Sequence, residues 1–405
     1  MRKNVLSQHI HSILQASALG AGLLLAPEYA AAAESFTEAL TGGKPTVDIR
    51  IRYEGVEQDT KEDASAITAR TRIGYLTGDY KGFNAFVEMS DTSALGDRKD
   101  FYVPAGPYAG GDSAKAVVLA PSLTVLNQAW IGYTLGKTNV KAGRQRITMD
   151  TRFLGNVGWR QKEQTYHGVS LNTKDIPNVD LNYAYITNAS NPVGVDSEMT
   201  SHAAKIDFTG IPFGTLSAYG YFLDYETGTD SQTLGARFAG KSKLTDNLGL
   251  IYHLEYASQS EYADSDNIGG DYTHGKLGVD FGKATVLVGQ ETLGGNGSHA
   301  FQTPLATLHL YNGWADMFLA TPANGLVDKY INLSGSAFGL KLAATYHDFT
   351  SDKGNINYGT EYDLLALKKF DKTYTAGIKY ASFAASNDYT YKDTNKIWVW
   401  GEMKF

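Results

Sequence analysis

The sequence predicts an all-β protein, a transmembrane antiparallel β-barrel of about 18 strands with short periplasmic turns and long extracellular loops. Three observations predict this fold: an export signal, segments in which apolar and polar residues alternate, and connections that are short and long in turn. No later stretch reaches the roughly 18 apolar residues of a transmembrane helix. A chain of this kind can enter a membrane only as a closed barrel.

The N-terminus reads as a secretory signal peptide. Arg2 and Lys3 precede an apolar run over residues 13–26, and three alanines at 31–33 supply a cleavage site. The run is too short to span a bilayer as an anchor. We therefore expect residues 1–33 to be cleaved and residues 34–405 to form one barrel domain in the outer membrane of a Gram-negative bacterium, in contact with its lipid.

Composition excludes several classes of protein. The chain has no cysteine and a formal charge of −7, which argues against disulfides and against a nucleic-acid partner. The nine histidines lack ligand spacing, so we expect no metal and no other cofactor. Serine and histidine form no recognisable catalytic group, so we expect no enzyme. The 26 tyrosines and 43 glycines suit barrel strands with aromatic girdles.

The strands themselves show a period of two. Residues 47–53 and 67–75 place apolar residues on one parity and charged residues on the other, and residues 179–185 and 248–256 repeat the pattern. In a barrel the apolar parity faces lipid and the polar parity lines the lumen. The predicted lumen residues that we regard as candidate pore-lining groups on strands are Arg50, Arg52, Arg70, Arg72, Glu361 and Asp363.

The connections divide into two classes. Short turns are predicted at 78–82, 136–137, 175–178, 210–214, 244–247, 281–283, 336–339 and 370–372, and the longest loops at 90–121 and 293–325. This alternation is typical of outer-membrane barrels. The last strand ends on Phe405, with apolar residues at alternate positions before it, which resembles the signal read by the barrel-assembly machinery. Whether either long loop gates the pore is left open.

Residues 143–168 form a charge-dense connection that we expect to narrow the bore. They contribute Arg144, Arg146, Arg152 and Arg160 as candidate constriction residues. The first two share the parity of Val140 and Ala142, so an unbroken strand would direct them at lipid. That would cost about 2–4 kcal/mol each near the bilayer midplane. We therefore predict a bulge, or an early end of the strand near Gly143, that turns both arginines inward.

The predicted lumen carries nearly equal numbers of basic and acidic groups, but the arginines cluster. Guanidinium groups bind carboxylates and phosphates in two-point contacts, so a ladder of arginines can pass an anion from site to site. The alternative is that these arginines pair with acidic residues and brace the wall. Both interpretations remain open for any single arginine.

Three segments resemble the alginate-export family of porin-like outer-membrane proteins. The first comprises GRQR at 143–146, RFLG at 152–155, WRQ at 159–161 and EQT at 163–165. The second runs from TPLAT at 303–307 through NGWAD at 312–316 to Tyr330, and the third is GTEYD at 359–363. The resemblance implies an eighteen-stranded monomer whose arginine-lined lumen carries an anionic polysaccharide.

We therefore expect an outer-membrane channel, or porin, that passes small or oligomeric anionic solutes such as uronates by diffusion. The alternative is a dedicated exporter of an acidic polysaccharide such as alginate. His309 and Trp314, in the late loop, are expected to pack that loop against the barrel wall, because aromatic and apolar residues surround them.

Overall fold

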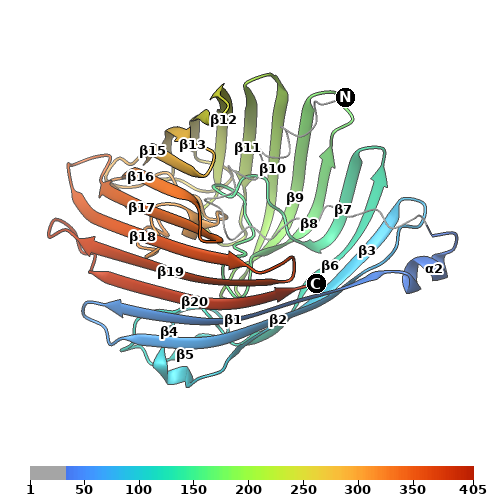
Figure 1. Ribbon diagram of the computed structural model, residues 1–405, viewed down its shortest axis with the longest axis horizontal. Helices are drawn as coiled ribbons and strands as arrows, with labels where there is room; N and C mark the ends of the chain where they lie inside the picture. Colours follow the sequence, from blue (N-terminus) through green and yellow to red (C-terminus); the bar gives the residue numbers. More distant parts are fainter. Residues whose placement is uncertain (1–32) are drawn as a thin grey trace.

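The computed structural model describes residues 33–405 and contains a closed antiparallel β-barrel of 18 strands (Figure 1). The predicted signal peptide, except for its last residue, lies outside the described residues. Closure is direct, because β1 pairs with both β2 and β20. Within residues 33–405, no helix is long and apolar enough to cross a membrane.

The barrel strands follow one another around the ring in chain order. They are β1 (Lys44–Gln58), β2 (Ala64–Leu76), β3 (Phe83–Ala94), β6 (Leu123–Leu135), β7 (Thr138–Gln145), β8 (Thr165–Thr173), β9 (Val179–Ser190), β10 (Asp196–Ile211), β11 (Gly214–Leu223), β12 (Ser231–Thr245), β13 (Leu248–Ser260), β14 (Gly270–Asp280), β15 (Ala284–Leu293), β16 (Leu326–Ala337), β17 (Leu340–Thr350), β18 (Asn357–Lys369), β19 (Tyr374–Ala385) and β20 (Thr394–Lys404). Smaller elements are α2 (Phe36–Thr41), η1 (Arg98–Asp100), β4 (Tyr102–Val103), β5 (Gly110–Gly111) and η2 (Leu308–Leu310).

The period of two in the sequence becomes an outer and an inner face. On β1, Ile51 is 51 % exposed and points outward, whereas Arg52 beside it is 1 % exposed. On β2, Ile73 is 59 % exposed and Arg72 is buried. An exposed apolar face is the surface that a barrel presents to lipid. The predicted parity of both strands is confirmed.

The two ends of the barrel differ as predicted. One end carries short turns, such as residues 136–137 and 246–247, and the other carries loops 95–122, 146–164 and 294–325. In outer-membrane barrels the short turns face the periplasm. The first loop begins at 95 rather than 90, because β3 continues through Ser90 and Thr92, whose buried side chains keep the inward parity.

Two of the long loops fold into the barrel. Loop 146–164 leaves β7 and forms ion pairs with Arg237 on β12, Glu291 on β15 and Glu54 on β1. These strands lie on different parts of the ring, so the loop must cross the interior. Phe301, Leu305 and Phe318 of loop 294–325 join the same buried apolar cluster as inward residues of many strands.

Loop 95–122 behaves differently. Its residues Phe101, Val103 and Val118 pack on Val56 and Ala66, at the long-loop ends of β1 and β2. This second cluster is separate from the interior one. The loop therefore braces the rim beside β1 and β2, while loop 294–325 occupies the interior.

Candidate functional site

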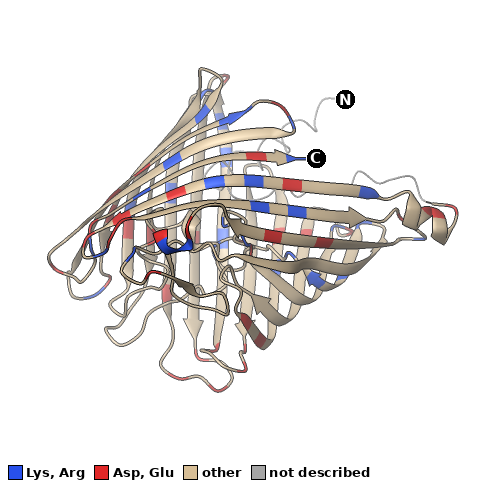
Figure 2. Cartoon of the chain, turned by 90° about the horizontal axis from the view of Figure 1, so that it is seen from below, with Lys and Arg blue, Asp and Glu red and all other residues tan. Residues whose placement is uncertain are grey.

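The arginines predicted on the first two strands form one patch on the inner wall. Arg50 and Arg70 are directly opposite each other in the β1–β2 register, and Arg72 is opposite Asp48. All four, including Arg52, are buried at 8 % exposure or less. Figure 2 shows basic and acidic residues side by side on the strands next to the C-terminus. We call Arg50, Arg52, Arg70 and Arg72 the arginine wall.

Carboxylates on β1 and β20 partly neutralise the arginine wall. Arg50 lies 3.1 Å from Glu402 on β20, and Arg52 lies 3.0 Å from Glu54. Arg70 pairs with Asp48. Like charges on adjacent strands repel each other, so these acids make the cluster tolerable.

Loop 146–164 covers the same wall with backbone carbonyls. Arg50 and Arg52 each donate from Nη1 to the carbonyl oxygen of Trp159, both at 3.0 Å. Arg72 donates to the carbonyl of Gln161 at 3.4 Å. The wall therefore holds the loop, which is part of what the bracing interpretation expects.

Some guanidinium groups of the wall keep donors that bind no acceptor. Within residues 33–405, Arg52 Nε, Arg72 Nε and both Nε and Nη1 of Arg70 are buried and make no hydrogen bond. A buried donor without an acceptor is costly, on the order of 1–3 kcal/mol. These donors therefore have no partner among residues 33–405.

Arg144 and Arg146, near the end of β7, have side chains that point in different directions. β7 keeps a continuous register with β6 and stops at Gln145, one residue before Arg146. Arg146 then turns inward and lies 2.9 Å from Glu88 and 2.6 Å from Glu163. Arg146 therefore faces the interior as predicted, although the strand ends at Gln145, two residues beyond the predicted end near Gly143.

Arg144 does not turn inward with it. It stays on β7 opposite His167, whose side chain is exposed, and its Nη2 is 3.9 Å from Asp196. Asp196 is itself 58 % exposed, so Arg144 lies at the rim. The prediction that both arginines face the lumen was wrong for Arg144, because β7 continues through Gln145 without a register shift against β6, so Arg144 keeps the outward parity of Ala142.

Arg152 and Arg160 fix loop 146–164 to opposite parts of the interior. Arg152 pairs with Glu291 at 2.9 Å and donates to Asn312 Oδ1 at 3.1 Å. Arg160 lies 3.3 Å from Glu54 and 2.5 Å from Asp316. Since Asn312 and Asp316 belong to the late loop, these arginines join the two inward loops to each other and to the wall.

Glu361 and Asp363 are buried under the late loop. Glu361 accepts the backbone N–H of Ala315 at 2.7 Å, and Asp363 accepts that of Trp314 at 3.2 Å. Gly313 permits this approach, because its φ is +85° and a Cβ there would lie 2.4 Å from Glu361 Oε2. Both carboxylates anchor the loop.

The ammonium group of Lys379 lies between aromatic rings and also contacts the late loop. The sequence did not predict that these side chains would lie together. Lys379 Nζ lies 4.2 Å from the ring centre of Trp159 and 3.7 Å from that of Trp314. It is 2.6 Å from His309 Nε2, and His309 stacks on Trp159. Cation–π contacts are strong when desolvated, at about 2 kcal/mol. The expectation that His309 and Trp314 pack the loop is confirmed.

Burial and ion pairs shift the pKa values of two residues in loop 146–164. Burial alone would raise the pKa of Glu163, but Arg146 and Arg72 hold that pKa well below its ordinary value. Burial lowers the pKa of Lys162 to about 8, although its ammonium donates to Asn191 O at 2.6 Å. Glu163 therefore stays ionised at neutral pH and keeps Arg146 in place.

Three potential metal ligands meet on the inner face of β13 and β14. Atoms of His253, Glu255 and His274 that could bind an ion lie within 4.8 Å of one another. The absence of ligand spacing led us to expect no such group. The missed signal was cross-strand pairing, because Glu255 and His274 are 19 residues apart but directly opposite in register.

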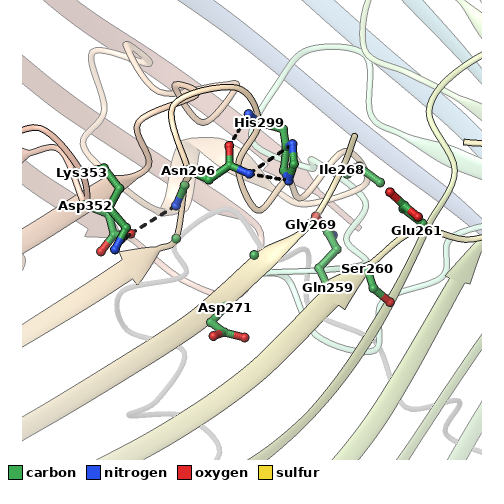
Figure 3. A pocket seen from close by; sticks show the side chains of 13 residues that line it. Gln259, Ser260, Glu261, Ile268, Gly269, Asp271, Asn296, His299, Asp352 and Lys353 are labelled. Atoms are coloured by element: carbon green, nitrogen blue, oxygen red, sulfur yellow. Dashed lines mark hydrogen bonds and ion pairs between the residues drawn. The ribbon is translucent and has the colours of Figure 1, made fainter. Parts of the chain in front are cut away.

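A separate hollow of about 640 Å³ opens among the loop ends of β13, β14 and β15. Figure 3 shows Glu261, Asp271, His299 and Asp352 around it, with Asn296 hydrogen-bonded to His299. No arginine lines it. This hollow is therefore distinct from the arginine wall.

Comparison with known proteins gives one family and one fold. Residues 47–284 match the family model described as alginate export. No curated protein matches the chain. Among solved structures, the barrel is similar to Pseudomonas aeruginosa OccK9 (OpdG), with a TM-score of 0.72 and 12 % identity over 91 % of this chain and 100 % of that one.

Two further structures agree. Pseudomonas aeruginosa OpdK with vanillate has a TM-score of 0.70 and 12 % identity over 89 % of this chain and 98 % of that one. Acinetobacter baumannii OccAB3 has a TM-score of 0.70 and 12 % identity over 90 % of this chain and 100 % of that one. At these identities the likeness concerns the fold.

Proposed function

The chain belongs to the alginate export family, and on that premise we propose that it passes small or oligomeric anionic solutes across the outer membrane by diffusion. It is an outer-membrane channel protein and not an enzyme. The single observation that carries the choice of anions is the arginine wall, with its buried N–H donors that have no acceptor in residues 33–405.

A guanidinium suits this task because it presents several fixed donors to a carboxylate. An anion that reaches Arg70 and Arg72 would meet donors that have no other acceptor, beside Asp48 and Glu402, which limit how tightly it binds. Conduction needs binding that is favourable but weak enough to release the solute. The near balance of charge therefore supports a modest anion preference.

The inward loops argue for small solutes. Loops 146–164 and 294–325 cross the interior and join through Arg160 and Asp316, which narrows the space beside the wall. A structure of OpdK carries vanillate, a small aromatic carboxylate. By analogy of fold, we propose monocarboxylates and short uronates as the solute class for this chain.

Ion selectivity in planar lipid bilayers tests the proposal. Purified protein in a salt gradient should give open channels whose reversal potential indicates anion preference, and added glucuronate should reduce the chloride current. Arg70→Gln should weaken both effects, whereas Arg144→Gln at the rim should leave them unchanged. A cation-selective wild-type channel would exclude the proposal.

A second candidate is export of an acidic polysaccharide. The packed interior favours it, because a core that includes Trp159, Leu305 and Phe318 would have to part before a polymer could pass. That function predicts no conductance in the intact chain and a large conductance after deletion of residues 298–320. Steady conductance of the intact chain would count against it.

A further inference from the structure

Three side chains on two neighbouring strands converge on one point of the inner wall. His253 and Glu255 are alternate residues of β13, and His274 on β14 is directly opposite Glu255. Alternate residues and directly opposed residues share one face of a sheet. His253 Nε2 lies 3.0 Å from Glu255 Oε2, and the two imidazole centroids are 4.9 Å apart.

Hydroxyl groups of tyrosine residues form hydrogen bonds with Glu255 and His274. Tyr219 Oη donates to Glu255 Oε1 at 2.8 Å, which leaves Oε2 beside His253. The His274 ring lies 3.3 Å from Tyr272 Oη through Nδ1 and 2.9 Å from Tyr330 Oη through Nε2, so one of these contacts must be replaced by the ion while the other orients the ring. Such outer contacts orient metal ligands in known sites.

We propose that His253, Glu255 and His274 form a binding site for a divalent transition-metal ion of the Zn²⁺ type in the lumen wall. Two imidazoles and one carboxylate are donors that zinc prefers, whereas calcium and magnesium prefer oxygen alone. Three protein ligands leave a fourth position for water or for a solute carboxylate. The site does not depend on the proposed solute.

The charges around the three ligands are of both signs, and the positive ones oppose a bound cation. Lys276 is opposite His253 in register, and Arg237 is opposite Glu255. Glu291 Oε1 lies 3.8 Å from His274 Nδ1, but the same oxygen is 2.9 Å from Arg152 Nε, so Arg152 adds a third positive charge near the site. Because Lys276 is only half-buried, its flexible stem can move its ammonium away from a bound ion.

The short-turn side supplies access. Toward that end, the side chain of Lys241 is 25 % exposed, and that of Arg237, level with Glu255, is 20 % exposed, whereas the side chains of the three ligands are 2–7 % exposed. An ion arriving from the periplasmic side would therefore pass partly open lumen before it reaches the ligands.

Zinc binding by the full chain tests the proposal. The protein should be purified without a polyhistidine tag and dialysed against a zinc series, and bound zinc should be measured by mass spectrometry. We expect about one ion per chain, the number a single three-ligand site holds. His253→Gln and His274→Gln should each weaken binding by roughly 100-fold, on the order seen when a metal site is damaged.

Two further variants sharpen the test. His202→Gln removes an outward histidine that contacts Tyr183 and should bind zinc like wild type. Lys276→Gln should bind zinc several-fold more tightly, because a nearby positive charge is lost. Heat-dependent gel mobility checks that each barrel is folded. The proposal is overturned if wild type binds no zinc, or if folded His253→Gln and His274→Gln bind it as tightly as wild type.

Discussion

Replacing Arg160 with methionine should release the two inward loops. Methionine keeps an unbranched apolar stem but removes the guanidinium group that joins Glu54 to Asp316. Loss of one partner from a buried ion pair costs about 3–5 kcal/mol. Glu54 retains Arg52 at 3.0 Å, and Asp316 retains His309 at 2.7 Å, so the lower end applies.

A loss of about 3 kcal/mol corresponds to a change on the order of 100-fold in the equilibrium between packed and released loops. The chain has no cysteine, so a single reporter can be placed at Ala306, which is 3 % exposed. In the Ala306→Cys background, the rate of maleimide labelling should rise about 100-fold with Arg160→Met when opening precedes labelling.

Arg144→Met is the matched control, since Arg144 lies at the rim beside an exposed carboxylate. Exposed pairs contribute little, about 0–1 kcal/mol, so the labelling rate should change by less than about fivefold. Equal rates in the Arg160 and Arg144 variants would refute the claim that Arg160 clamps the loops.

Three further outcomes follow from the same contacts. Arg72→Gln should move the reversal potential toward that of a non-selective channel, and an unchanged potential would mean that this arginine only braces the wall. Asp363→Ala leaves the N–H of Trp314 without its acceptor, at a cost of about 1–3 kcal/mol, and should speed labelling of Ala306→Cys by roughly 5- to 150-fold. Because the pKa of Glu163 lies below its ordinary value of 4.5, its stabilisation is full above that pH and declines as the pH falls further. The stability difference between wild type and Glu163→Gln, measured by urea unfolding, should therefore be constant from pH 7 to pH 5 and shrink below pH 4.5; growth of the difference on acidification would contradict the ion pairing.

Local patterns made the barrel predictable. The alternation of apolar and polar residues along residues 47–53 does not depend on distant contacts, and neither do the lengths of the turns. The number of strands and the face on which each side chain lies could therefore be predicted from the sequence. Strand ends were less certain, because small polar residues such as Ser90 continue a strand without an apolar partner. The same limit applies at Arg144, which remains on β7 because the strand continues to Gln145.

The partners of the site residues could not be predicted from spacing. Arg152 meets Glu291 across 139 positions of sequence, and the wall donates to carbonyls of Trp159 and Gln161 that carry no sequence signature. These contacts exist only once loop 146–164 crosses the barrel. The grouping of His253 with His274 likewise depends on strand register.

Single-channel recording in a salt gradient tests the central claim most directly. The account predicts that the intact, monodisperse protein conducts with a modest anion preference, and that Arg70→Gln reduces this preference while Arg144→Gln does not. A cation-selective wild-type channel, or equal selectivity in both variants, would contradict a role for the arginine wall in choosing the solute.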